Sequence, residues 1–183
     1  LANEIDFAVS TDNYSVKDHA LSDWGAQEEI DNADSPLAPE SDANDQLNAS
    51  LDLSQELRVA GLVFAAGTYP ASNKVTLSGT SQWGQSADAP ISDVQTAIET
   101  CFVRANTLVF GIDTWLVFRR LPEILDAVKA IAGTSLQGGM ATPSAVANLF
   151  EVDRILIGRG RYITTKEGQT SIYARVWGKH FSA

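Results

Sequence analysis

The pattern of apolar and polar positions is weak in the first forty residues of the chain. In residues 5–10 apolar side chains alternate with polar ones, which predicts a short strand, and residues 13–20 indicate a second extended piece. The intervening Thr-Asp-Asn, residues 11–13, is typical of a turn. Residues 23–39 are polar and acidic and contain two prolines, so we expect an exposed connection there.

The strongest helical pattern covers residues 41–66. Its apolar side chains fall largely on one face. They are Leu47, Leu51, Leu57, Val63 and Phe64. We expect Ser41 to cap the helix, because a serine oxygen can accept a hydrogen bond from a free N–H of the first turn. About 25 residues at 1.5 Å each give a helix of roughly 37 Å, long enough to act as a spine.

The remainder of the chain alternates between short helices and short strands. We expect a strand at residues 74–77, a helix at 90–104 that Asn106 breaks, and a buried strand at 108–110 that ends at Gly111. Further helices are expected to start at Asp113 as an N-cap, at Pro122, and at Thr142-Pro143, with stops at Phe118, Gly133 and Phe150. Residues 134–141 are expected to form a mobile loop, and strands are expected at 152–158 and 171–178 with a Glu167-Gly168 turn between them. The predicted fold class is α+β, without internal repeats.

Charge separates the first third of the chain from the rest. Of the total charge of -10, residues 1–56 carry 14 acidic side chains and only Lys17, while residues 57–183 carry 9 acidic and 12 basic ones. Carboxylates repel phosphate, so the acidic segment is unsuited to binding duplex DNA. Two interpretations stay open: an arm that charge keeps soluble, or an extended arm that docks on a basic surface of a partner. Trp24, in this arm, is typical of a contact that awaits a partner.

Residue types that carry chemistry are sparse. The single Cys101 excludes an internal disulfide, fits a reducing compartment and is expected to be a packed core thiol. His19 and His180 are far apart in sequence, and no metal-ligand or nucleophile motif is present. No apolar run is long enough to cross a bilayer. We therefore predict no catalytic, cofactor-binding or metal-binding residue, no cofactor, no membrane partner and no enzymatic activity.

Three basic or aromatic features have a structural interpretation. Gly158-Arg159-Gly160-Arg161 lacks the lysine and hydroxyl residue of a phosphate loop, so its glycines are expected to relieve a bend at a strand end. Arg119 and Arg120 are expected at a helix end, where cations complement the dipole. Packing or interface roles are expected for Trp83, Trp115 and Trp177.

The order of several short motifs resembles the major capsid proteins of tailed bacteriophages with the HK97-type fold. The stretch begins with residues 106–111 (NTLVFG), continues with Trp115-Leu116 and residues 121–124 (LPEI), and ends with residues 142–152 and 155–158. Upstream, residues 57–60 resemble the end of the family's spine helix, and residues 69–71, 77–79 and Trp83 resemble its continuation.

This resemblance implies an architecture and a function. Residues 1–40 would be an acidic arm like the E-loop, which lies over a neighbouring subunit, and residues 41–105 the spine helix and peripheral domain. Residues 106–165 would contribute to the axial domain, and residues 166–183, with Ile172, Ala174 and Val176, a strand that returns to the core sheet of the peripheral domain. The chain would be a fragment of a phage or prophage head protein that self-assembles through pentamers and hexamers into an icosahedral shell around DNA.

The resemblance also implies partners and a location. Scaffolding, portal or decoration proteins are expected partners, and packaged double-stranded DNA is expected to bind only non-specifically. The expected location is the virion, which is assembled in the bacterial cytoplasm. Two alternatives stay open at this point: a shell subunit of an encapsulin-like protein compartment, and a small acidic hydrolase that uses buried carboxylates.

Overall fold

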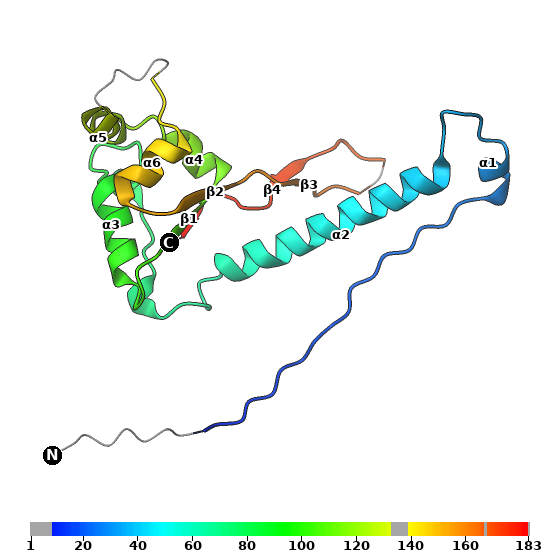
Figure 1. Ribbon diagram of the computed structural model, residues 1–183, viewed down its shortest axis with the longest axis horizontal. Helices are drawn as coiled ribbons and strands as arrows, with labels where there is room; N and C mark the ends of the chain where they lie inside the picture. The colour runs from blue at the N-terminus through cyan, green and yellow to red at the C-terminus, as the bar shows by residue number, and fades with distance from the viewer. Residues whose placement is uncertain (1–8, 133–138, 167, 183) are drawn as a thin grey trace. The chain divides into compact units, whose positions relative to one another are not determined.

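The computed structural model describes residues 9–132, 139–166 and 168–182 of the chain (Figure 1). The chain divides into two units, Leu1–Leu51 and Asp52–Ala183, and the long helix α2 (Pro39–Val63) contributes residues to both. Most of the predicted strand at residues 5–10, the predicted stop at Gly133, most of the predicted loop at 134–141 and Glu167 lie outside the described residues. Each unit is described separately below.

The described residues of the first unit form no hydrophobic core. None of the described residues 9–51 is buried, and residues 9–26 form neither helix nor strand. The expected turn at residues 11–13 is fixed locally, because the backbone N–H of Asn13 donates to Asp12 Oδ1 at 2.8 Å. The connection at residues 23–39 is exposed as predicted but is not wholly irregular, since it contains the one-turn helix α1 (Gln27–Asp31), stabilised by a 2.9 Å bond from Gln27 Nε2 to Asp31 Oδ1.

The predicted long helix is confirmed, although its cap is not Ser41. Helix α2 begins at Pro39, and the carbonyl of Ala38 accepts the hydrogen bond from Asp42 N at 2.9 Å. Proline lacks a backbone N–H, and at the first helical position this N–H would have no partner within the helix, so proline is favoured there. The helix therefore starts two residues before Ser41, at Pro39. Ala60 is the only buried residue of α2.

Two expectations for the segments around α3 (Pro90–Thr100) are wrong. The predicted strand at residues 74–77 is an exposed connection between the 3₁₀ turns η1 (Ala71–Asn73) and η2 (Gly79–Ser81), since no neighbouring strand pairs with it among the described residues. Helix α3 ends at Thr100 and not at residue 104, because Arg104 reaches the end of another helix and donates to the carbonyl of Phe150 at 3.2 Å. Cys101 is consequently half-buried and lies outside the core.

The predicted strand–helix–helix–helix order from residue 107 onward is confirmed. Strand β1 is followed by three helices that lead to the parallel strand β2. The elements are β1 (Thr107–Gly111), α4 (Ile112–Phe118), α5 (Pro122–Ala132), α6 (Pro143–Phe150) and β2 (Arg154–Gly158). Thr142 caps α6, as expected, by accepting from Ala145 N at 3.3 Å. Gly111, and not Asp113, precedes α4, and Asp113 lies within its first turn.

The strands form two small sheets. In the first, β1 lies between β2 and β5 (Phe181–Ser182), with Leu108 opposite Ile155 and Phe110 opposite Phe181. In the second, β3 (Arg161–Ile163) pairs antiparallel with β4 (Tyr173–Arg175). The turn at Gly168 therefore joins β3 to β4, and the strand that returns to the first sheet is β5, not the segment with Ile172, Ala174 and Val176. The strand predicted at residues 171–178 is present in part as β4, but its predicted place in the core sheet is wrong, because it pairs with the short β3.

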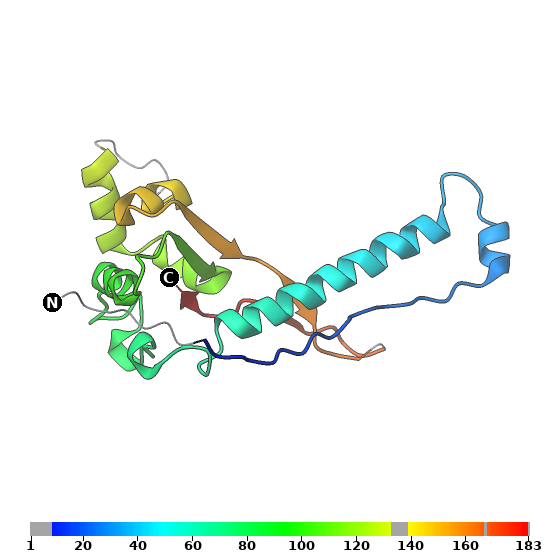
Figure 2. The same ribbon diagram turned by 60° about the horizontal axis from the view of Figure 1, so that its bottom comes forward.

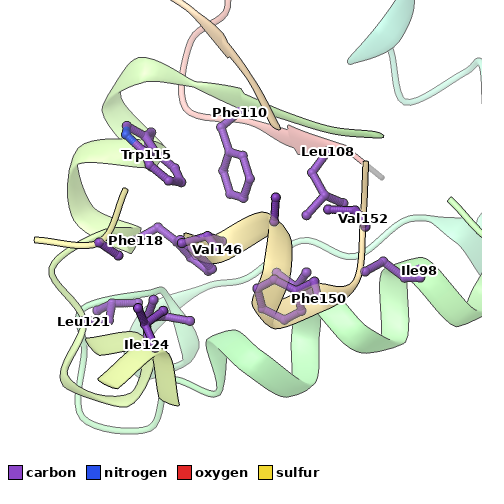
Figure 3. Close-up of a cluster of buried hydrophobic side chains, with 14 residues drawn as sticks. Ile98, Leu108, Phe110, Trp115, Phe118, Leu121, Ile124, Val146, Phe150 and Val152 are labelled. Atoms are coloured by element: carbon purple, nitrogen blue, oxygen red, sulfur yellow. The ribbon is translucent and has the colours of Figure 1, made fainter. Parts of the chain in front are cut away.

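The core of the second unit lies between the three-stranded sheet and helices α3–α6 (Figures 1 and 2). Leu108 and Phe110 point from β1 toward these helices, where Phe118 of α4 is fully buried (Figure 3). The rings of Phe110 and Phe118 are 5.2 Å apart, and Trp83 lies 5.0 Å from Phe118. The indole N–H of Trp83 donates to Asp93 at 2.8 Å, so the loop before α3 is fixed on the core.

Candidate assembly surfaces

The interior of the described part of the chain is apolar. Every buried residue in it is apolar or a glycine or proline, and no group of three or more His, Cys, Asp and Glu side chains could hold a metal ion there. Among the same residues, no helix is both long and apolar enough to span a bilayer. His180 is occupied in packing, since its ring stacks on Phe64 at 4.9 Å. Surfaces, and not a pocket with buried carboxylates, are therefore the candidate functional sites.

The glycines of the Gly158-Arg159-Gly160-Arg161 stretch serve close packing. A Cβ atom at Gly158 would lie 2.0 Å from Cγ of Trp177, and one at Gly160 would lie 2.6 Å from Oε2 of Glu56. Gly158 therefore needs to be glycine because the indole ring occupies the space, whereas a side chain at residue 160 would displace the flexible Glu56 carboxylate. The stretch therefore packs against the Trp177 ring and the Glu56 carboxylate and does not resemble a phosphate-binding loop.

Trp177 connects helix α2 to the end of the β3–β4 hairpin, and we call this arrangement the Trp177 junction. Its indole N–H donates to Glu56 Oε1 on α2 at 2.5 Å, and its ring meets that of Phe64 edge-on at 5.8 Å. Near it, Arg175 of β4 forms a 2.7 Å ion pair with Asp113 of α4, and both side chains are about one-third exposed or less. The junction holds the hairpin in one position relative to residues 52–63 of α2 and to the first sheet.

The other aromatic and basic residues lie where the sequence indicated. Trp83 and Trp115 pack in the core, and Trp177 packs in the junction. Arg119 follows the last residue of α4, and its guanidinium lies 5.9 Å from the ring centre of Trp115. These residues therefore contribute to the packing of the fold.

The arm exposes apolar side chains without a core to receive them. Trp24 is 86% exposed, and its backbone N–H is bound only by the neighbouring Asp23 side chain at 2.8 Å. Other apolar side chains of the segment share this exposure. They are Val9, Tyr14, Val16, Leu21 and Leu37. Large apolar groups on an acidic, unpatterned segment are typical of a surface that a partner covers.

A second apolar surface lies on the hairpin. A shallow hollow between α2 and the hairpin is lined by Leu53 of α2 and by side chains of β3 and β4. The hairpin residues that line it are Arg161, Tyr162, Ile163 and Tyr173. Ile163 and Tyr173 are more than half exposed. We call this surface the hairpin hollow.

A third apolar surface follows α3. Phe102 is fully exposed and Val103 is 75% exposed, although the helical pattern placed Phe102 on the apolar face of a helix. The helix expected at residues 90–104 hid this surface, because α3 ends four residues earlier, at Thr100. We call Phe102 and Val103 the Phe102 knob.

Comparison with known proteins identifies relatives from phages. The chain is 35% identical to the major capsid protein of Pseudomonas phage JBD67 over 180 residues, which cover 98% of this chain and 57% of that protein. It is 28% identical to the major capsid protein of Burkholderia phage BcepMu over 128 residues, or 68% of this chain and 40% of that protein. The chain thus spans about half the length of these curated relatives. No family model matches the sequence.

A solved structure shares the fold. It is a phage-related protein from Bordetella bronchiseptica RB50, which superimposes with a TM-score of 0.63 at 20% identity and covers 78% of this chain and 44% of the other. The chain is thus similar to two phage major capsid proteins, in agreement with the resemblance of its ordered motifs. It shares the mixed α+β fold of the solved structure.

Proposed function

We propose that the chain is part of a structural head subunit that assembles with copies of itself into an icosahedral shell enclosing phage DNA. The observation that carries this proposal is the 35% identity to a phage major capsid protein over almost the whole chain. The apolar character of the buried residues supports a structural role over a hydrolytic one, since a carboxylate with raised proton affinity needs a buried or paired site. The relatives' names favour a phage head over an encapsulin-like compartment.

The proposal includes the HK97-type division of the chain. Residues 1–40 act as the extended arm, residues 41–105 contain the spine helix and peripheral elements, residues 106–165 contribute to the axial domain, and residues 166–183 return to the peripheral domain. The long α2 supports the spine assignment, because a 25-residue helix with a single buried residue has most of its surface available to neighbours. Pentamers and hexamers of the subunit form the shell, which is assembled in the host cytoplasm.

The arm supplies contacts between subunits in this proposal. Its described residues 9–51 carry ten acidic side chains and only Lys17, so a basic surface of a neighbour would suit them. Opposite charges on the arm and on a neighbour's basic surface would select the register of the contact and disfavour wrong pairings. We expect scaffolding, portal or decoration proteins as further partners, and DNA to be contacted without sequence preference.

Deletion of residues 1–36 tests this division of labour. The remaining chain keeps every buried residue of the described part and should stay folded, which circular dichroism and thermal unfolding measure. It should no longer assemble, which light scattering and electron microscopy measure. Loss of the cooperative unfolding transition would show that the arm belongs to the core. Unchanged assembly would show that the arm makes no essential contact.

A further inference from the structure

The Phe102 knob is unusual because it is apolar, exposed and held in place on both sides. Before it, Cys101 Sγ contacts the carbonyl of Ala97 at 3.5 Å, and after it Ala105 packs against the core. Arg104 binds the carbonyl of Phe150 at 3.2 Å and Glu151 at 3.4 Å. A side chain presented on a fixed backbone loses little freedom when it binds, so it can act as an anchor of an interface.

The knob has an acidic surround. Glu99 and Glu151 are both about three-quarters exposed, and Asp153 is exposed as well, while Arg104 among them is basic. The exposed Arg154 follows Asp153, so the surround carries one negative charge in excess. A partner surface that fits it should be apolar at its centre and basic at its edge.

The hairpin hollow has these properties. Leu53, Tyr162, Ile163 and Tyr173 supply apolar walls, and Arg161 lines the hollow. Arg159 is exposed beside it, and within the described ranges neither arginine forms an ion pair. A guanidinium without a carboxylate partner, next to half-exposed aromatic rings, suits a surface that receives an acidic and apolar one.

Knob and hollow belong to different elements of the same unit. The knob follows α3 in the helical layer, whereas the hairpin extends from the sheet away from α3 and α5 (Figures 1 and 2). Where a copy offers its knob to one neighbour and its hollow to another, the contact is heterologous and leaves a free knob and a free hollow at its ends. Contacts of this kind repeat until they close into a ring.

We infer that the Phe102 knob of one subunit inserts into the hairpin hollow of a second copy of this chain. The inference rests on the proposed self-assembly and names one contact that it uses. Residues 9–26 with Trp24 are the competing occupant, but they lack regular structure and must be ordered on binding, whereas the knob is fixed already.

Charge exchange tests the contact in the 183-residue chain. Phe102→Ala should weaken self-association about tenfold or more, as measured by sedimentation equilibrium, without lowering the unfolding temperature, because Phe102 contacts no core. Glu99→Lys and Arg161→Glu should each weaken association, and the double variant should recover most of it. Val75→Ala, which removes another exposed apolar side chain, is the matched control and should leave association unchanged.

The outcomes separate this contact from self-assembly itself. If the unaltered chain associates and Phe102→Ala associates equally well, the knob is not the anchor although assembly stands. If Arg161→Glu weakens association while Phe102→Ala does not, and Trp24→Ala does, the hollow receives the arm and the inference is overturned. An unaltered chain that stays monomeric at every concentration would contradict the proposed function as well as the contact.

Discussion

A methyl group at Gly158 should loosen the Trp177 junction. The Cβ atom of Gly158→Ala would lie 2.0 Å from Cγ of Trp177 and 2.2 Å from Cδ1, whereas carbon atoms in contact prefer about 3.5–4.0 Å. The indole ring must therefore retreat by about 1.5 Å or more. Overpacking of this kind costs roughly 1–3 kcal/mol.

The retreat also disturbs a hydrogen bond. The indole N–H donates to the Glu56 carboxylate at 2.5 Å. A hydrogen bond to a charged group contributes about 1.5–3 kcal/mol, and this bond contributes only part of that because the pair is half-buried. Together these effects predict a loss of roughly 2–4 kcal/mol in the free energy of unfolding. At about 2–4 °C per kcal/mol for a chain of this size, the unfolding temperature should fall by roughly 4–16 °C.

The chain offers a matched control and an internal suppressor. Gly61→Ala, in α2, has no atom within 4 Å of its new Cβ and should leave stability unchanged or raise it by up to about 1 kcal/mol. If the indole ring is the obstacle, adding Gly158→Ala to a Trp177→Ala variant should lower the free energy of unfolding almost no further. A double-mutant cycle by thermal or urea unfolding measures this. Equal unfolding temperatures for Gly158→Ala and the unaltered chain would refute the reasoning.

Two further stability predictions concern the cap of α6 and the core. Thr142→Ala removes the oxygen that accepts from Ala145 N and should lower the free energy of unfolding, measured in urea, by about 1 kcal/mol. Ser41→Ala should leave it almost unchanged, because Ser41 lies inside α2. A larger loss at Ser41 than at Thr142 would show that Ser41 is a cap. Phe118→Ala should cost roughly 3–5 kcal/mol, since this side chain is fully buried among aromatic rings, while Val75→Ala should stay within about 0.5 kcal/mol. A small loss at Phe118 would contradict the assigned core.

Helices with a local start signal could be predicted from the sequence. Pro122 and Thr142-Pro143 mark the starts of α5 and α6 because both the missing N–H and the capping oxygen act within one turn. The buried strand β1 was predictable from its unbroken apolar run. The similarity to phage major capsid proteins could also be predicted, because the resemblance rests on the order of such local motifs.

Features that depend on distant residues could not be predicted in the same way. The early end of α3 follows from the bond of Arg104 to Phe150, which lies 46 residues away, and the Trp177 junction joins residues 121 positions apart. The pairing of β3 with β4 was missed because three-residue strands carry almost no periodic signal. The exposure of Phe102 follows from the first of these contacts, so the knob was hidden by an incorrect helix end.

Electron microscopy of the purified full-length protein tests the central claim most directly. A structural head subunit with a coreless arm and several exposed apolar surfaces should form uniform, closed, hollow shells, or regular rings on the way to them. A protein that remains monomeric across the full range of concentration and salt, while fully folded, would contradict the assignment of its function to contacts between subunits.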